Sequence, residues 1–349
     1  MNPKVSINIV AWNSMDFLPD LLRSIFAQTY QDFEVLVIDN GSDDGVELFL
    51  REHYPQVKIL RNMKNLGFSP AHNQGIRFVL DRWDPSVQDD RFVLVTNPDL
   101  VMTDTFLERL METVEGRPEV GSFGGKLLRA YGENLADEAL KETVQSDRID
   151  STGLVAKRNR TFFDRGAGEI DKGQFDDQRD VFGISGALVL YRARALEDAR
   201  FEDEFFDHDF FAYKEDTDLA WRLQLLGWKA HYQPQALAYH YRGMFGKEKT
   251  GLWERIQNRR KKSRTRSYYS NRNHWNMLTK NELFVNKLLA APHIFIQEAA
   301  RFIYVVVFEP STLKAFGEAI VRTPTMWKKR KHTMKKRKTT ASEMRKWFT

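Results

Sequence analysis

Apolar residues recur at two alternating spacings along the first 125 positions of the chain. Val5, Ile7 and Ile9 alternate with other residues as in a strand, whereas residues 18–26 carry apolar side chains at helical spacing. The same alternation continues, with further strands predicted at 34–39, 57–62 and 92–97 and further helices at 69–80 and 104–115. Apolar strands that alternate with helices predict an α/β fold with a mostly parallel sheet covered on both faces.

The later part of the chain is less regular. Residues 130–180 are polar and show no clear period, which predicts a long loop region. Strand character returns in "GALVLY" at 186–191, and a helix is predicted from about 215 to 226, where Gly227 ends it. The composition becomes basic and aromatic after Arg242. This change indicates a domain boundary.

The net charge of +5 hides an uneven distribution. Residues 255–266 hold seven Lys or Arg and no acid, and residues 327–349 hold ten Lys or Arg and one Glu, so the rest of the chain carries −11. Trp and Tyr interleave with these cations, a composition typical of helices on an anionic membrane surface. A solvated charged tail is the plain alternative. A nucleic-acid-binding tail is a third, which the acidic remainder of the chain disfavours.

Composition narrows the class of protein. A hydrophobic content of 42% with 25 Phe predicts a globular chain, and the absence of Cys excludes disulfides and thiolate metal sites, in keeping with a reducing cytosol. We expect no signal peptide, because a strand begins almost at once. We also expect no transmembrane helix, since Pro292, Glu298 and Arg301 interrupt the best candidate, 287–308.

Polar residues follow several predicted strands. The carboxyl ends of parallel strands meet at one rim, where ligands bind, and this places Trp12–Asn13, Asp39–Asn40 and Asn97–Asp99 together. Asp39 could accept a hydrogen bond from a pyrimidine ring or a ribose hydroxyl, or it could simply form an Asx-turn. Asn65, Gly67 and Asn73 surround a helix N-terminus, either as a polar lining or as caps.

Acidic residues cluster around the helix at 215. Glu215, Asp216 and Asp218 lie in its first turn, and three more acids lie at 203–207 beside four Phe. Acids there can merely offset the helix dipole, at about 0.3–1 kcal/mol each. They also suit an aromatic-walled cavity for hydroxyl-bearing ligands, with Asp216 as an ionised general base.

His240 follows a strand-like stretch near the end of the α/β part. A lone His is usually structural. With Asp99 it could instead form a two-point site for a hard divalent ion that leaves positions open for phosphate oxygens.

In this order, the segments "VSINIVAWNSMDFLPDLLRSIFAQTYQDFEVLVIDNGSDDG", "NLGFSPAHNQG", "LVTNPDLVM", "GALVLY" and "FFAYKEDTDLAWRLQLLGW" resemble the family 2 glycosyltransferases. The likeness spans about 4–243 and is greatest to the bacterial rhamnosyltransferase-like branch. It implies a GT-A fold, a nucleotide-binding α/β sandwich, as a catalytic domain at 1–243, followed by a basic, aromatic helical extension at 244–349.

The resemblance also implies roles for individual residues. Asp39 matches the carboxylate that recognises the uracil or thymine ring, with the Ala11–Trp12–Asn13 backbone alongside. Asp216 matches the catalytic base, with Glu215 as its neighbour. Asp99 matches the last acid of the D-x-D metal motif, and His240 matches a histidine that completes the metal site in some members. Asn97 stands where that motif has its first acid, so the implied site for Mg²⁺ or Mn²⁺ has less negative charge than one with two carboxylates.

The implied activity is inverting transfer of a sugar in cell-surface polysaccharide synthesis. Rhamnose is the best guess, carried by dTDP or UDP, and galactofuranose, glucose or N-acetylglucosamine are the alternatives. The acceptor would be a saccharide or a polyprenyl-diphosphate-linked saccharide. The enzyme would then be cytoplasmic and peripheral at the inner face of the cell membrane, held through 255–266 and 327–349, with no nucleic-acid partner. A catalytically dead sugar-nucleotide sensor is disfavoured because Asp216 is present.

Overall fold

The computed structural model describes residues 3–132, 143–241 and 264–349. Its strands are β1 Val5–Ala11, β2 Phe33–Asp39, β3 Lys58–Arg61, β4 Phe92–Thr96, β5 Leu100–Met102, β6 Val120–Gly132, β7 Thr143–Ser151, β8 Leu154–Ala156, β9 Phe162–Asp164, β10 Asp180–Val181, β11 Leu188–Arg192 and β12 Lys229–Tyr241. Its α-helices are α1 Leu18–Phe26, α2 Val46–His53, α3 Phe68–Leu80, α4 Phe106–Val114, α5 Ala193–Ala199, α6 Glu215–Leu225, α8 Arg264–Asn281, α9 Phe284–Leu289, α10 Ala291–Phe308, α11 Leu313–Lys336 and α12 Ala341–Arg345.

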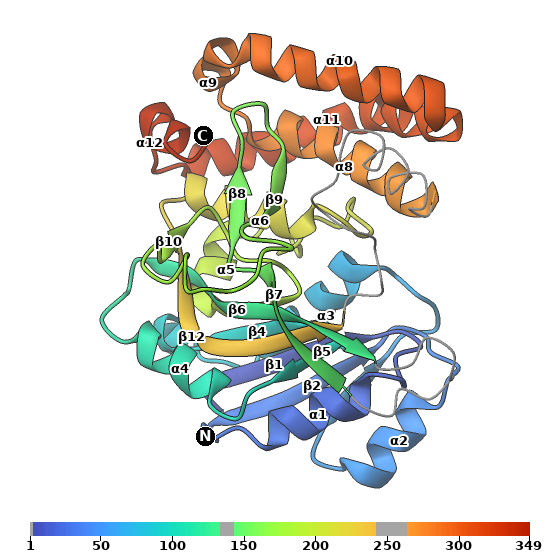
Figure 1. Ribbon diagram of the computed structural model, residues 1–349, viewed down its shortest axis with the longest axis vertical. Helices are drawn as coiled ribbons and strands as arrows, with labels where there is room; N and C mark the ends of the chain where they lie inside the picture. The colour runs from blue at the N-terminus through green and yellow to red at the C-terminus, as the bar shows by residue number, and fades with distance from the viewer. Residues whose placement is uncertain (1–2, 133–142, 242–263) are drawn as a thin grey trace.

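One large sheet runs through the lower part of the molecule in the order β10-β12-β6-β11-β4-β1-β2-β3 (Figure 1). Strands β3, β2, β1 and β4 are all parallel, as the sequence predicts. Beyond β4 the sheet is mixed, because β11 runs antiparallel to both β4 and β6 while β12 is parallel to β6. The parallel half therefore ends at the strand that brings "GALVLY" into the sheet.

Helices cover both faces of this sheet, and each face has its own apolar cluster. Helices α1, α2 and α4 pack on one face against side chains such as Ile7 and Ile9. Helices α3, α5 and α6 pack on the other face against side chains such as Ile38 and Val95. Burial on both faces explains why β2 and β4 read as continuous apolar runs.

The prediction of a long loop at 130–180 is wrong for the parts of that segment that form strands. It contains the end of β6, then β7, the β8–β9 hairpin and the start of β10. Among the named strands of the described chain β7 pairs with β6, and β8 and β9 have three residues each. Such short or edge strands need no apolar alternation, so the sequence shows no period there. Residues 133–142 lie outside the described part of the chain.

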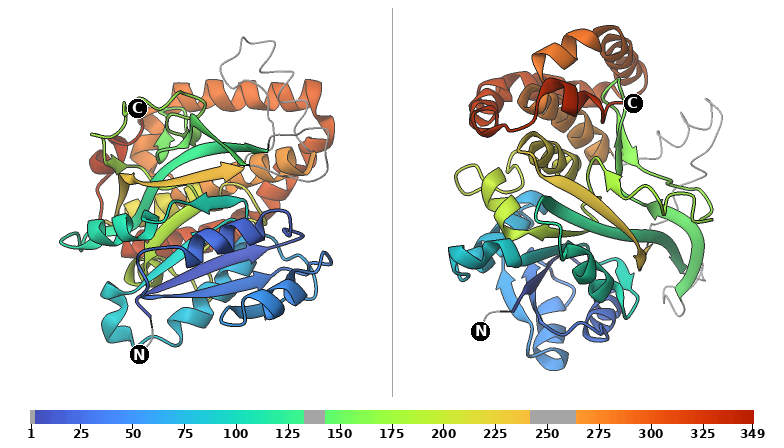
Figure 2. Two further views of the ribbon diagram at one scale, coloured as in Figure 1. Left: turned by 60° about the horizontal axis from the view of Figure 1, so that its bottom comes forward. Right: turned by 90° about the vertical axis from the view of Figure 1, so that its left-hand side faces the viewer.

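The helices after residue 263 lie together at the end of the molecule away from the N-terminus (Figure 2). A third apolar cluster joins them to the rest of the chain: Met277 of α8, Met326 of α11 and Phe348 pack with Trp221 of α6 and Phe162 of β9. The rings of Trp221 and Phe348 lie 5.2 Å apart. These helices therefore share a core with the sheet-bearing part.

Helix α10 differs from what the sequence led us to expect of residues 287–308. It is long and apolar enough to cross a membrane by length and composition, and 6% of it is buried. Pro292 falls in its first turn, where proline is tolerated. Glu298 bonds to His274 of α8 at 2.9 Å, so this charge faces the protein and interrupts no exposed apolar surface.

Candidate active site

One rim of the sheet brings the predicted rim residues into a row. Ala11 at the end of β1 pairs with Asp39 at the end of β2, and on its other side β1 pairs with β4, which ends at Thr96. The amide of Asn97 donates to Ala187 O at 2.9 Å, which carries the row on to β11. Adjacent strands lie about 4.8 Å apart, so the row from β2 to β11 spans about 14 Å. This is room for a ligand of nucleotide-sugar size.

Asp39 is buried at the tip of β2, with 1% of its surface exposed. Its Oδ1 accepts from the amide of Ser42 at 2.9 Å, which is the turn geometry considered as the alternative from sequence. Its Oδ2 lies 3.6 Å from Arg61 Nε. Asn13, at φ 48°, accepts from the amide of Asp43 at 3.0 Å, so the turns after β1 and β2 brace each other.

The polar residues after β3 form a second turn beside this one. Asn40 Nδ2 donates to Asn65 Oδ1 at 2.9 Å, and Asn65 Oδ1 also accepts from the amide of Gly67 at 2.8 Å. Gly67 has φ 87°, and a Cβ there would come within 2.5 Å of Phe211, so only glycine fits. Trp12 stands out from this rim, 54% exposed.

Asn73 is fully buried behind the rim. Its Nδ2 donates to Phe206 O at 2.7 Å, and its Oδ1 accepts from the amides of Phe205 and Phe206. These bonds involve both polar atoms of the side-chain amide and hold the loop ahead of α6. The structure therefore places Asn73 as a support for this loop, and does not bring it to the rim itself.

Asp99 and His240 lie together, as the predicted metal pair requires. β5 pairs with β12, with Leu100 opposite His240, and His240 Nε2 lies 3.3 Å from Asp99 Oδ1. The other ring nitrogen, Nδ1, lies 2.8 Å from Oδ2 of the buried Asp150. Burial alone would lower the pKa of His240, but the hydrogen bond to Asp150 and the neighbouring carboxylate of Asp99 outweigh this and raise it to about 9.

This pair fits a divalent ion by its chemistry. Asp99 Oδ1 is buried and accepts no hydrogen bond of good geometry within the described residues. A carboxylate behind a ligating histidine is a common way to fix the orientation of the ring. The described residues hold no group of three or more His, Cys, Asp or Glu placed to bind a metal. An ion here would take two protein ligands and fill its other positions with water and phosphate oxygens.

Asp216 lies at the start of α6. Its carboxylate contacts Gly186, which precedes β11, the last strand in the row of strand ends. Its Oδ2 accepts from the amide of Gly186 at 3.1 Å, and its Oδ1 accepts from the amide of Thr217 at 2.6 Å. A Cβ on Gly186 would lie 2.9 Å from Asp216 Cβ. A glycine at 186 is therefore what lets the carboxylate approach the sheet.

Glu215 sits beside this carboxylate but is buried. Burial, and next the negative charge of Asp216, raise the pKa of Glu215 to about 8. It is mostly uncharged at neutral pH, and its Oε2 has no hydrogen-bond partner within the part of the chain that the structure describes. Glu215 therefore adds little negative charge beside Asp216 at pH 7.

A cavity of about 570 Å³ opens beside Asp216. Its walls come from the β8–β9 hairpin, the start of α6, and helices α8 and α10, and its lining includes Phe162, Arg266, His274 and Arg301. The carboxylate thus lies between the sheet rim and a chamber closed by the C-terminal helices.

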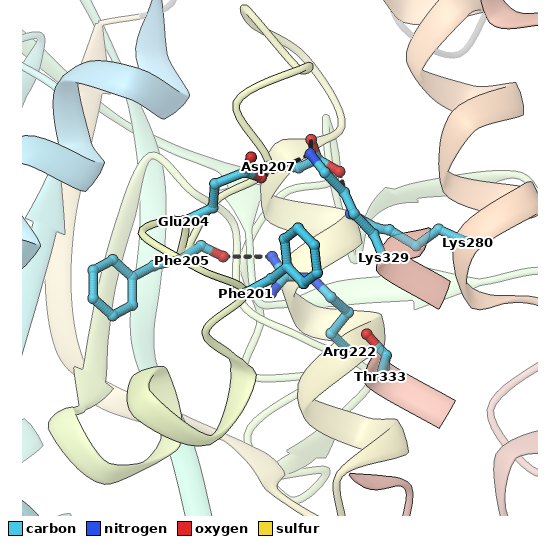
Figure 3. Close-up of a pocket in the computed structure, with 8 residues that line it drawn as sticks. All are labelled: Phe201, Glu204, Phe205, Asp207, Arg222, Lys280, Lys329 and Thr333. Carbon is cyan, nitrogen blue, oxygen red and sulfur yellow. Dashed lines mark hydrogen bonds and ion pairs between the residues drawn. The ribbon is translucent and has the colours of Figure 1, made fainter. Parts of the chain in front are cut away.

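The acids at 203–207 do not line a ligand cavity as we expected. Figure 3 shows Asp207 and Glu204 facing Lys280 and Lys329, which come from α8 and α11. Lys329 Nζ lies 2.7 Å from Glu204 and 2.9 Å from Asp209, and Lys280 Nζ lies 2.8 Å from Asp218. Asp207 pairs with both lysines. Glu204, Asp207, Asp209 and Asp218 attach the C-terminal helices through lysines more than 60 residues away in the sequence, whereas Asp203 pairs with Arg77 of α3.

Sequence reasoning missed three kinds of residue at this site. Gly186 was visible as part of "GALVLY", but nothing local showed that its amide meets Asp216. Asp150 lies in the segment taken for a loop. Arg266 was counted only within a basic segment, and Arg301 only as an interruption of an apolar run. The positive charges of Arg266 and Arg301 are visible in the sequence. They do not show that the two side chains line the same cavity.

The chain is similar to known proteins over most of its length. The sequence model of a family described as "Glycosyltransferase like family 2" matches residues 3–265. The chain is 27% identical over 248 residues to the N-acetylglucosaminyl-diphospho-decaprenol L-rhamnosyltransferase of Mycobacterium tuberculosis, covering 69% of this chain and 77% of that protein.

Two solved structures share the fold. The crystal structure of S. aureus TarS 1-349 in complex with UDP-GlcNAc matches with a TM-score of 0.52 at 14% identity, over 95% of this chain and 89% of that one. The crystal structure of GalNAc-T7 with UDP, GalNAc and Mn²⁺ matches with a TM-score of 0.57 at 11% identity, over 80% of this chain and 48% of that one.

Proposed function

The chain belongs to glycosyltransferase family 2, and we propose that it transfers a sugar with inversion from a nucleoside-diphosphate donor on the sheet rim, with Asp216 as general base. One observation carries the assignment of the base. Asp216 is held by the amides of Gly186 and Thr217 at the end of the rim, directly beside a cavity large enough for an acceptor.

The reaction is a single displacement. The acceptor hydroxyl gives its proton to Asp216 as its oxygen attacks the anomeric carbon from the face opposite the nucleotide. The bond from that carbon to the phosphate oxygen breaks, and the nucleoside diphosphate leaves with the electron pair. Glu215, mostly uncharged, adds little negative charge near the attacking oxygen.

The donor would lie along the ends of β1, β2 and β4. Asp39 would accept a hydrogen bond from the pyrimidine ring of the nucleotide, beside the backbone of Ala11, Trp12 and Asn13. Asn65 and Gly67 shape the turn next to it. Asn97 would face the diphosphate. The nucleotide is then a dTDP or UDP sugar, which agrees in kind with the UDP-GlcNAc bound to TarS.

Asp99 and His240 would hold a Mg²⁺ or Mn²⁺ ion, with Asp150 fixing the imidazole. A divalent ion there supplies positive charge for the departing diphosphate. In support, the GalNAc-T7 structure of the same fold contains Mn²⁺.

Rhamnose is the proposed sugar, and a lipid-linked saccharide the proposed acceptor, because the name of the mycobacterial relative specifies both. Among galactofuranose, glucose, N-acetylglucosamine and rhamnose donors, we expect the rhamnose donor to raise the Tm most. A thermal-shift screen of these nucleotide sugars measures this directly.

The cytoplasmic enzyme would bind the inner face of the cell membrane through its C-terminal extension. Of segment 255–266, only 264–266 lie within the described residues. In 327–349, Lys329 is used in buried ion pairs, but Trp327 and a series of cations stay exposed: Lys331, Lys335, Lys336, Arg337 and Lys338. Liposome flotation with anionic lipid, compared with an oligonucleotide gel shift, separates this proposal from the nucleic-acid alternative.

Asp216→Asn tests the base. The amide keeps the size of the side chain but cannot take the proton, so we expect turnover to fall about 10²–10⁴-fold while nucleotide affinity is unchanged. Thr217→Ser is the matched control, since it keeps the hydroxyl group that donates to Asp216. Normal turnover in Asp216→Asn would remove the assignment.

A further inference from the structure

The turn ahead of the proposed base has an unusual backbone conformation. Tyr213 and Lys214 have φ of 71° and 76°, and Lys214 is the residue that caps the start of α6, two positions before Asp216. The left-handed region is rare for residues other than glycine, and such residues stay in it only where surrounding contacts hold them there. The contacts of this turn therefore decide how α6 begins and where the Asp216 carboxylate lies.

The side-chain amide of Asn273 holds this turn. Asn273 lies on α8 and is fully buried, and its Nδ2 donates to Ala212 O at 2.9 Å and to Tyr213 O at 2.8 Å. Its Oδ1 accepts from Arg272 Nε at 3.1 Å. The two carbonyl groups belong to the peptide planes that precede Tyr213 and Lys214. Because each peptide unit is planar, fixing these two planes fixes φ of both residues.

Neighbouring residues of α8 contact the same loop farther from the base. The ring of Tyr269 stacks on that of Phe211 at 5.1 Å, and the side chain of Arg272 donates to Asp209 O. Asn273 bonds nearer to Asp216 than either of them does, and its burial keeps it from meeting a substrate. Residue 273 also lies beyond 265, where the match to the family model ends. This contact is therefore made by a part of the chain outside that match.

We propose that Asn273 is a positioning residue for the base, which makes α8 part of the catalytic unit. Its two hydrogen bonds keep Tyr213 and Lys214 in the left-handed region, so that α6 starts with the Asp216 carboxylate beside Gly186 and the cavity. Without them the turn relaxes to the commoner negative φ values and displaces the carboxylate. The inference rests on the proposed function of Asp216 and adds to it a residue from the C-terminal helices.

Asn273→Leu removes both donated hydrogen bonds at nearly constant side-chain volume. We expect kcat to fall at least about tenfold, because a misplaced catalytic group slows the reaction steeply. The affinity for UDP or dTDP should be unchanged, since the ends of β1, β2 and β4 keep their contacts. Turnover is measured with the nucleotide sugar that raises the Tm most. If Asn273→Leu melts below the assay temperature, Asn273→Ser gives the same comparison, because its shorter side chain reaches neither carbonyl group.

Asn281→Leu is the matched control. Asn281 also lies on α8 and is fully buried, but its Nδ2 donates to Asp218 Oδ1 at 2.8 Å, inside α6 and beyond the turn. Both substitutions remove a buried hydrogen bond between α8 and the α6 region, so both should lower the Tm. Asn273→Leu alone should lower kcat. An equal fall of kcat in the two variants would show that Asn273 only attaches α8, and would overturn the proposal.

Hydrogen exchange tests the same inference without a substrate. The backbone amides of 212–217 should exchange at least about tenfold faster in Asn273→Leu than in the wild type or Asn281→Leu, because the turn opens once its carbonyl groups are released. Unchanged exchange there, or normal kcat in Asn273→Leu, overturns the proposal. Normal turnover in Asp216→Asn would instead remove the base assignment and leave the exchange result as it is, so the two failures are distinguishable.

Discussion

Lys329→Met should remove a buried cation that attaches α11 to the loop ahead of α6. The Lys329 side chain is 5% exposed and pairs with Glu204, Asp207 and Asp209, and Asp207 is itself buried. Breaking a buried ion pair by removing one partner costs about 3–5 kcal/mol, because the remaining charges stay in a poorly solvated place. At an unfolding entropy of about 2.1 cal/mol/K per residue, cooperative unfolding of the chain turns this into a fall in Tm of roughly 4–7 °C.

The adjacent lysine gives the control. Lys328 pairs with Glu202 at 2.8 Å, but both side chains are about two-thirds exposed. Lys328→Met should therefore change stability by less than about 0.5 kcal/mol. Thermal melts followed by circular dichroism compare the two variants. An equal fall in Tm for both would refute the view that burial of the Lys329 network stabilises the docking of α11.

The effect should also depend on pH. Burial alone would raise the pKa of Asp207, but Lys280 and Lys329 hold it well below its usual range. A carboxyl group with a depressed pKa stabilises the folded state above the pKa of the unfolded chain, about 3.9, and this stabilisation is lost as pH falls through the folded-state pKa. The difference between wild type and Lys329→Met should be full at neutral pH and shrink below about pH 4.

Three further substitutions test the rim. Gly186→Ala should cut kcat about tenfold or more while leaving nucleotide affinity unchanged, because its Cβ would lie 2.9 Å from that of Asp216 and a small misplacement is costly; unchanged kcat would contradict this. Asp99→Ala should weaken binding of the nucleoside diphosphate in Mn²⁺ by calorimetry, and equal affinities with and without metal in the wild type would count against the ion site. Asp150→Asn should lower the pKa of His240 from about 9 in an NMR titration of the metal-free protein, since its bond to Asp150 raises that pKa; an unmoved titration would show that Asp99 alone maintains it.

Much of the rim could be predicted from sequence because it depends on local pattern. Apolar runs marked β1, β2 and β4, and parallel strands must end at the same edge, so Trp12–Asn13, Asp39–Asn40 and Asn97–Asp99 were expected there together. The start of α6 was equally visible, and with it Asp216. The family resemblance supplied the roles of these residues, which periodicity alone does not.

The segment 130–180 and the acids at 203–207 show where local pattern is not enough. β7 and the β8–β9 hairpin are strands because of the partners beside them, and their own side chains carry no period. The acids suggested a sugar cavity, yet their partners are lysines on α8 and α11. An isolated cluster of carboxylates does not show whether a ligand or the protein itself supplies the opposite charge.

The sequence by itself determined the alternation of strands and helices over the first 125 residues, the residues at the ends of those strands and the uneven charge, because these follow from the spacing of neighbouring residues. Only the tertiary structure decided that the amide of Gly186 holds Asp216 and that Arg266 and Arg301 face the same cavity. It also decided that α10 turns its charges inward and its apolar side chains outward. The physical reason is that burial and pairing are settled by contacts between distant segments, and the spacing of residues along the chain does not specify which of those contacts form.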